Sequence, residues 1–168
     1  MSKPIVAILM GSKSDLDKIS PAIDVLREFN VPVAVRVMSA HRSPDIVCQF
    51  VAAASANGYK VIIAAASGAA HLAGVTAAHT CLPVIGIPVE GGAFNGLDSL
   101  LSTVQMPGGI PVATVAVGSA GARNAGLLAV RILALSDPNL AEQLTRFQAK
   151  LRADVIAADE ELQRKLIS

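Results

Sequence analysis

The stretch IVAILMGSKSD at residues 5–15 joins a continuous apolar run to a short polar loop. An uninterrupted apolar run of strand length is typical of a strand that is buried on both faces of a parallel sheet. The next residues predict a helix with one buried face, because apolar side chains recur at Leu16, Ile19, Ile23, Leu26 and Phe29. We expect Gly11 to adopt an unusual backbone angle after the strand and Asp15 to cap the helix. Strand, polar loop and helix in this order are the repeating unit of a parallel α/β fold.

The same unit recurs along the chain and predicts a single domain over residues 1–168. Four further strands are expected at residues 31–38, 61–66, 84–89 and 111–117. Helices are expected at residues 44–57, 72–80, 97–105 and 122–135, and a helix of about 30 residues follows Asp137. This alternation predicts a five-stranded parallel sheet in the order 2-1-3-4-5 with right-handed crossovers.

The composition indicates a domain that assembles with copies of itself. Hydrophobic residues make up 52% of the 168 residues and charged residues only 16%, and the mean hydropathy is +0.54. So few charges on an apolar chain indicate that other subunits cover part of the surface. The formal net charge is +1, so the chain lacks the charge excess that binds a nucleic-acid backbone or an anionic membrane. We therefore expect a homo-oligomer without a nucleic-acid or membrane partner.

The N-terminal sequence and the cysteines favour a cytoplasmic protein. The chain enters its first strand at Pro4 without a basic region or a cleavage site, so no secretion signal is expected. Cys48 and Cys81 do not match a zinc or redox motif, and we expect both to be reduced thiols. Residues 61–78 are apolar, but polar residues and glycines interrupt them too often for a membrane-spanning helix.

The last predicted helix, residues 137–167, carries an apolar stripe that a small five-stranded domain cannot cover completely. The stripe consists of Leu140, Leu144, Phe147, Leu151, Val155, Ala158, Leu162 and Leu166. The helix could lie along its own sheet or pack on a neighbouring subunit. We expect packing on a neighbouring subunit, because the stripe is too long for one domain of this size.

Three polar segments follow the first three predicted strands and are expected to form one pocket. They are Gly11-Ser12-Lys13-Ser14-Asp15, Ser39-Ala40-His41-Arg42 and Ser67-Gly68-Ala69-Ala70-His71-Leu72. The carboxyl ends of parallel strands meet at one edge of a sheet, where ligands bind. Arginine offers a planar fork of donors suited to phosphate, and histidine titrates near neutral pH. The set therefore predicts an enzyme that combines phosphate binding with proton transfer.

Each of these residues also has a structural interpretation. Asp15 could cap its helix or accept hydrogen bonds from a ribose diol. His41 and His71 could each serve only in structural hydrogen bonds, but their common place at one sheet edge favours a functional pair. His79 lies inside a predicted helix and is expected to be structural. Two histidines without a nearby carboxylate cluster do not indicate zinc or magnesium, so no metal is expected.

Two further motifs follow these loops, NGLDSLL at residues 95–101 and VQMPGG at residues 104–109. Together with the three loops they resemble the 5-(carboxyamino)imidazole ribonucleotide mutase family of purine biosynthesis. The similarity runs from Ile5 to Leu133. It implies a three-layer flavodoxin-like domain and a homo-octamer in which the C-terminal helix reaches another subunit. It also implies a reaction without a metal or an organic cofactor.

The resemblance further implies a role for each matched residue. The phosphate would be held by Ser12, Ser14 and Arg42, and the ribose hydroxyls by Asp15. His41 would be the general acid and base, and His71 would orient the carboxylate or the freed carbon dioxide. The imidazole and carboxylate site would be lined by Ser39, Ala40, Gly68, Ala70, His71 and Leu72. The chain departs from the family pattern at Ser67, at Ala73 and at residues 90–94. We expect these departures to affect how the substrate is positioned more than which class of reaction is catalysed.

The expected reaction moves a carboxylate from the exocyclic nitrogen of carboxyaminoimidazole ribonucleotide to the adjacent ring carbon. It proceeds through decarboxylation, retention of carbon dioxide and recarboxylation, and His41 could carry the one proton between carbon and nitrogen. A related class carboxylates aminoimidazole ribonucleotide directly, but its second loop typically has lysine where this chain has Arg42. The other alternative is a non-catalytic nucleotide-binding module on the same fold, which a His41 buried away from the pocket would favour.

Overall fold

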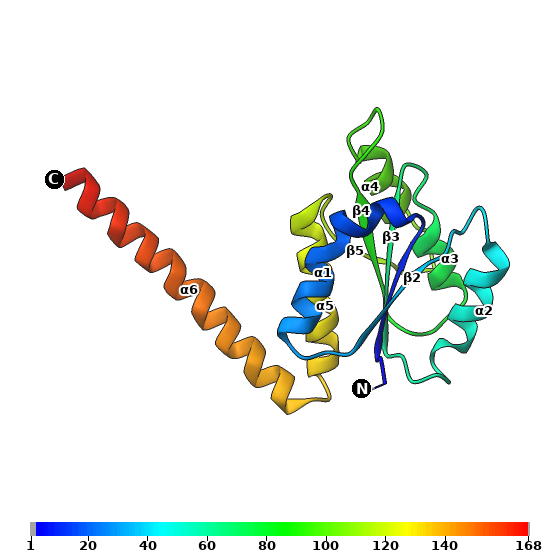
Figure 1. Ribbon diagram of the computed structural model, residues 1–168, viewed down its shortest axis with the longest axis horizontal. Coiled ribbons are helices and arrows are strands. Elements are labelled where there is room, and N and C mark those ends of the chain that lie inside the picture. Colours follow the sequence, from blue (N-terminus) through cyan, green and yellow to red (C-terminus); the bar gives the residue numbers. More distant parts are fainter. Residues whose placement is uncertain (1–2, 168) are drawn as a thin grey trace.

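The computed structural model describes residues 3–167 and contains a five-stranded parallel sheet (Figure 1). The strand order is β2-β1-β3-β4-β5, which confirms the predicted order. All neighbouring strands pair in parallel. The strands are β1 (Val6–Met10), β2 (Val33–Val37), β3 (Val61–Ser67), β4 (Val84–Val89) and β5 (Ala113–Thr114).

Helices cover both faces of the sheet and produce the expected three layers. One face carries α1 (Leu16–Glu28) and α5 (Ser119–Ala134), and the other carries α2 (Pro44–Ala54) and α3 (Leu72–Ala78) (Figure 1). The shorter α4 (Leu97–Val104) packs on β4 and β5. The chain continues into α6 (Pro138–Ile167).

The central strand β1 shows why the first apolar run is uninterrupted. Val6, Ile8 and Met10 pack in the same core as α1 and α5, whereas Ala7 and Leu9 pack with α2 and α3. None of the five is more than 4% exposed. Successive side chains of a strand point to opposite faces, so a strand between two helical layers must be apolar throughout.

The loop after β1 differs from the sequence expectation. Gly11 does not adopt a left-handed backbone angle. Residues Lys13–Asp15 form a short 3-10 turn that Ser12 caps, because its Oγ accepts a hydrogen bond from the Ser14 amide at 3.3 Å. Asp15 precedes α1 but makes no capping hydrogen bond. The 3-10 turn already gives Asp15 helical angles, φ −84° and ψ −9°, instead of the extended conformation from which a capping side chain reaches back.

The region around β5 also differs from its predicted bounds. Only Ala113 and Thr114 pair with β4, although residues 111–117 were expected to form the strand. Pro111 cannot donate to a strand ladder, and the chain turns at Gly118 with φ of 83°. The helix α5 begins at Ser119, earlier than the predicted residue 122. Its first turn lies so close to the preceding segment that a Cβ at Gly121 would meet a backbone carbonyl.

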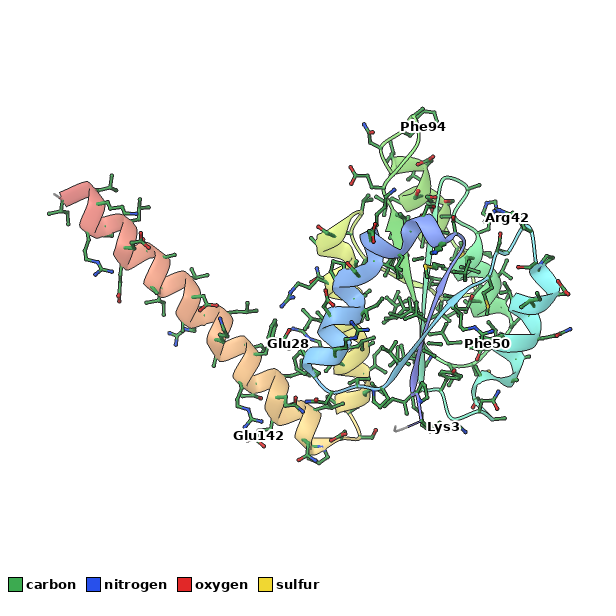
Figure 2. The ribbon with its side chains drawn as sticks, in the orientation of Figure 1. Lys3, Glu28, Arg42, Phe50, Phe94 and Glu142 are labelled. Atoms are coloured by element: carbon green, nitrogen blue, oxygen red, sulfur yellow. The ribbon has the colours of Figure 1, made fainter. Side chains whose placement is uncertain are left out.

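The long helix α6 leaves the body of the domain after its first turns (Figure 1). Leu140 is buried, and Leu144 and Phe147 pack against the core, where the Phe147 ring lies edge-to-face with Phe29 at 5.8 Å. From residue 148 to residue 167 every side chain is exposed, and Figure 2 shows them projecting away from the rest of the chain. The helix therefore does not lie along its own sheet. Within residues 3–167, no helix has the length and apolar character needed to cross a membrane.

Candidate active site

A cavity of about 220 Å³ opens at the carboxyl ends of β1, β2 and β3. Arg42 marks this edge in Figure 2, at the opposite end of the sheet from Lys3. The residues that line the cavity are Gly11, Ser12, Asp15, Ser39, Ala40, His41, Arg42, Ala66, Ser67, Ala69, His71 and Leu72. The three polar loops therefore meet, as the parallel topology requires. Of the site residues expected from the sequence, Ser14, Gly68 and Ala70 are outside this lining.

The first loop and Arg42 bring a cation and two hydroxyls together. Ser12 Oγ lies 2.8 Å from Ser14 Oγ. Arg42 Nη2 donates a hydrogen bond to the Gly11 carbonyl at 2.5 Å, which ties the second loop to the first. A guanidinium has five N–H donors, so this bond leaves others for a ligand. Hydroxyls beside a guanidinium are a donor set suited to a phosphate group.

Asp15 places a carboxyl group in the wall of the same cavity, and only 4% of the residue is exposed. Burial raises the pKa of this carboxyl above its ordinary value. The nearby charge of Lys18, a hydrogen bond from the Ser12 backbone amide and the charge of Arg42 act in the opposite direction and lower the pKa. Lys18 also donates to the Glu90 carbonyl at 2.6 Å, so it connects Asp15 with the glycine-rich loop after β4. The sequence analysis did not single out Lys18.

The turn that presents His41 and Arg42 is built around Ser39. Its Oγ accepts hydrogen bonds from the amides of His41 and Arg42, at 3.3 and 3.2 Å. The Ser39 backbone is bonded in turn to Ser43, whose Oγ lies 3.1 Å from the Ser39 amide. Ser43 directly precedes α2, so the turn is anchored to the start of a helix. Ser39 therefore fixes the loop as well as lining the cavity.

The two histidines of the cavity contact each other directly. His41 Nε2 lies 2.8 Å from His71 Nδ1, and the two rings are almost perpendicular, at 89°. One nitrogen must donate and the other accept, so at least one of the rings is neutral in this arrangement. Since His41 lines the cavity, the burial that would favour a non-catalytic module is not found. His79 lies outside the cavity, and its Nδ1 is 2.8 Å from the Val75 carbonyl of α3.

The loop that carries His71 is attached to α4, which the sequence analysis did not anticipate. The amides of Gly68 and Ala70 donate to Ser99 Oγ at 2.8 Å and to Ser102 Oγ at 3.0 Å. These N–H groups are therefore not available to a ligand in this conformation. The motif at residues 95–101 contains Ser99, but spacing alone does not show which loop its hydroxyl contacts.

The positions that depart from the family pattern have different surroundings. Ser67 lies at the end of β3 and lines the cavity. Ala73 is buried in α3, against the site of Gly86 in β4, and does not line the cavity. Phe94 is 66% exposed in the loop after β4. Of these departures, Ser67 is therefore the one that lines the cavity. Among residues 3–167, no group of three or more His, Cys, Asp or Glu side chains is placed to hold a metal ion.

A family model described as AIR carboxylase matches residues 5–154. The chain belongs to the AIR carboxylase family. Among its relatives, the N5-carboxyaminoimidazole ribonucleotide mutase of Bacillus subtilis is 52% identical over 160 residues, which cover 95% of this chain and 99% of that protein. The mutase of Mycobacterium tuberculosis is 54% identical over 163 residues, with coverage of 96% and 92%. These matches confirm the family resemblance found in the sequence.

Solved structures of the family confirm the fold. A crystal structure of PurE from Treponema denticola has a TM-score of 0.86 and 30% identity to this chain. The match covers 95% of this chain and 98% of that one. The AIR carboxylase family therefore shares the three-layer arrangement and not only the loop motifs. The names of the curated relatives support the mutase interpretation over direct carboxylation.

Proposed function

We propose that the protein is an N5-carboxyaminoimidazole ribonucleotide mutase that transfers a carboxylate from the exocyclic nitrogen of its substrate to the adjacent ring carbon. The observation that carries the proposal is the His41–His71 pair, which lines a cavity next to a phosphate-type donor set. A nucleotide whose phosphate sits at Arg42 would reach the histidines with its base, because His41 and Arg42 are consecutive. The relatives that are named as this mutase support the assignment.

The proposed binding mode uses each loop for one part of the nucleotide. Arg42, Ser12 and Ser14 hold the phosphate through charge-assisted and hydroxyl hydrogen bonds. Asp15 accepts hydrogen bonds from the ribose hydroxyls. The imidazole and its carboxylate lie against the second and third loops, at Ser39, Ala40, Gly68, Ala70, His71 and Leu72. Because their amides are bonded to α4, Gly68 and Ala70 contribute shape and not N–H donors.

The proposed chemistry needs one proton that is given and then recovered. His41 donates a proton to the exocyclic nitrogen, the carbon–nitrogen bond of the carbamate breaks, and carbon dioxide is released into the closed site. The electron pair of the enamine-like ring then attacks carbon dioxide from the adjacent carbon. His41 removes the proton from that carbon and is restored, so the rearrangement has no net proton or electron demand. His71 orients the carboxylate or the carbon dioxide, and its hydrogen bond fixes the His41 ring.

The exposed part of α6 supports a homo-oligomer, for which an octamer is the expected size. Leu151, Val155 and Leu162 are 50%, 70% and 52% exposed in the C-terminal part of α6, where every residue from 148 to 167 is exposed. Burying each large apolar side chain contributes about 1.5 to 3 kcal/mol, so a neighbouring subunit gains by covering them. We further propose a cytoplasmic enzyme, since Cys48 and Cys81 are both free thiols and a reducing compartment keeps them so.

A turnover assay with two substrates tests the proposed function. The protein should convert carboxyaminoimidazole ribonucleotide without added bicarbonate, and should act far more slowly on aminoimidazole ribonucleotide with bicarbonate. The second reaction is the alternative because the matching family is described as AIR carboxylase. A protein that turned over aminoimidazole ribonucleotide with bicarbonate but not carboxyaminoimidazole ribonucleotide would overturn the mutase proposal. A protein that turned over neither nucleotide would overturn the proposal that it is an enzyme of this kind.

A further inference from the structure

The loop between β3 and α3, residues 68–71, is fixed by hydroxyl groups from another part of the chain. It has no helix or strand of its own, and Gly68 adopts a left-handed φ of 64°. Two of its amides, those of Gly68 and Ala70, donate to Ser99 and Ser102 of α4, more than thirty residues away along the chain. The conformation of the loop therefore depends on where α4 holds these two hydroxyls.

The Ser99 hydroxyl has a fixed orientation because it also donates its own proton, and the Ser102 hydroxyl has acceptors in both the helix and the loop. Ser99 Oγ donates to the Val89 carbonyl at the end of β4, at 2.9 Å. Ser102 Oγ lies 2.7 Å from the Asp98 carbonyl one turn earlier in α4, and the carbonyls of Gly68 and Ser99 are 3.2 and 3.3 Å away. A hydroxyl that donates one hydrogen bond and accepts another has little freedom to rotate. Ser99 is also fully buried, so water cannot replace it as the partner of the Gly68 amide.

The helix that bears the serines is packed directly on the sheet. A Cβ at Gly86 in β4 would lie 2.4 Å from the Thr103 methyl group, so glycine at this position lets α4 approach the strand. At the other end of the helix, Gly96 takes a φ of 87°, and a Cβ there would lie 2.6 Å from a Val117 methyl group. Close packing at both ends leaves α4 little room to shift relative to β4.

The fixed loop ends at His71, which is hydrogen-bonded to His41. Neither Ser99 nor Ser102 lines the cavity, so they act only through this loop. We propose that Ser99 and Ser102 are positioning residues that hold the His71 loop and thereby align the histidine pair for proton transfer. The inference rests on the proposed function, because it names residues that serve the same reaction.

Variants that remove the hydroxyls test this role against a matched control. The variants are Ser99→Ala, Ser102→Ala and the double substitution in the full-length protein. The control is Thr103→Val, which removes a buried hydroxyl from the same helix. Thr103 Oγ1 bonds the Ser99 carbonyl within α4 and makes no hydrogen bond to the loop. All variants are first compared by thermal unfolding and by mass, and Ser102→Ala is the milder change because Ser102 is half-buried.

The alanine variants should lower kcat about 10- to 100-fold and leave KM within about twofold, because misaligned catalytic groups cost turnover more than uniform binding. The pH profile of kcat should change as well, since the hydrogen bond of the pair is altered. Thr103→Val should keep both values even where it lowers the melting temperature. A double variant with wild-type kcat and pH profile would overturn the inference.

Two measurements separate this inference from the proposed function. Hydrogen exchange of peptides that cover residues 68–71 should be faster in the alanine variants than in the control. A crystal structure of the double variant should place His41 Nε2 and His71 Nδ1 beyond hydrogen-bonding distance, about 3.5 Å. If the wild-type protein turned over neither nucleotide, the proposed function would be wrong. Independently of that result, an unchanged His41–His71 distance in the structure of the double variant would refute the positioning role.

Discussion

Replacing His41 with asparagine tests the proton-transfer step most directly. Asparagine retains a group that can form one hydrogen bond, but it cannot take up and release a proton near neutral pH. The phosphate-type donors of the site, Arg42 Nη2 and the hydroxyls of Ser12 and Ser14, do not involve the His41 ring. His41→Asn should therefore abolish turnover and leave nucleotide affinity almost unchanged.

The size of the effect follows from what the ring does. A positioned general acid or base contributes about 10²- to 10⁴-fold in rate, which corresponds to about 3 to 5.5 kcal/mol of transition-state free energy. The direct 2.8 Å contact with His71 favours the upper part of this range, because asparagine can keep a hydrogen bond to His71 but cannot exchange a proton with it. Nucleotide binding, measured by calorimetry, should change by less than about 1 kcal/mol, since no phosphate contact is lost.

A matched control separates the chemistry from a general effect of losing a histidine. His79→Asn makes the same replacement outside the cavity, where Nδ1 of the ring is hydrogen-bonded to the Val75 carbonyl. We expect this control to keep wild-type kcat. If His41→Asn retained more than about a tenth of wild-type kcat, well above the loss expected for a general acid and base, His41 would not be the proton carrier.

Three further predictions concern binding, pH and assembly. Arg42→Ala should weaken nucleotide binding by about 1.5 to 3 kcal/mol, the value of hydrogen bonds to a charged group, and calorimetry that shows unchanged affinity would place the phosphate elsewhere. Burial raises the pKa of Asp15, so its charged form destabilises the folded state and the free energy of unfolding should fall as the pH rises through this pKa. Asp15→Asn should remove this pH-dependent loss of stability and should also weaken nucleotide binding. Unfolding curves of the two proteins that keep the same pH dependence would contradict this assignment. Val155→Asp with Leu162→Asp should reduce the mass seen by light scattering, whereas Ala149→Asp, at an exposed position on the opposite face of α6, should not; an oligomer of unchanged size would show that the stripe is not an interface.

The sheet could be predicted from the sequence because burial on both faces leaves a simple signal. The uninterrupted apolar runs at β1, β3 and β4 correspond to strands between two helical layers. At the edge strand β5 the apolar run at residues 111–117 is longer than the strand, because only Ala113 and Thr114 pair with β4. Strand ends were therefore less certain than strand order, which the alternation of elements and the handedness of crossovers already restrict.

The residues of the candidate site could be found only in part. The segments that directly follow strands come together by topology, so His41, Arg42 and His71 could be grouped without a structure. The helical conformation of Asp15 could not be predicted, because the 3-10 turn that removes its capping role depends on the Ser12 hydroxyl. The contacts of Ser99 and Ser102 with the His71 loop depend on how α4 packs, which no local pattern specifies.

His41 and Arg42 lie in one turn, so phosphate binding at Arg42 can affect the position of the His41 ring. Ser39 Oγ accepts hydrogen bonds from the amides of both residues, and Arg42 donates one to the Gly11 carbonyl. A ligand that binds Arg42 would therefore also order the neighbouring histidine. Binding energy from the phosphate, which does not react, would then orient His41, which transfers the proton. The corresponding nucleoside, which lacks the phosphate, should be turned over slowly even when it saturates the enzyme. Added inorganic phosphate should restore part of that rate by occupying the empty place beside Arg42.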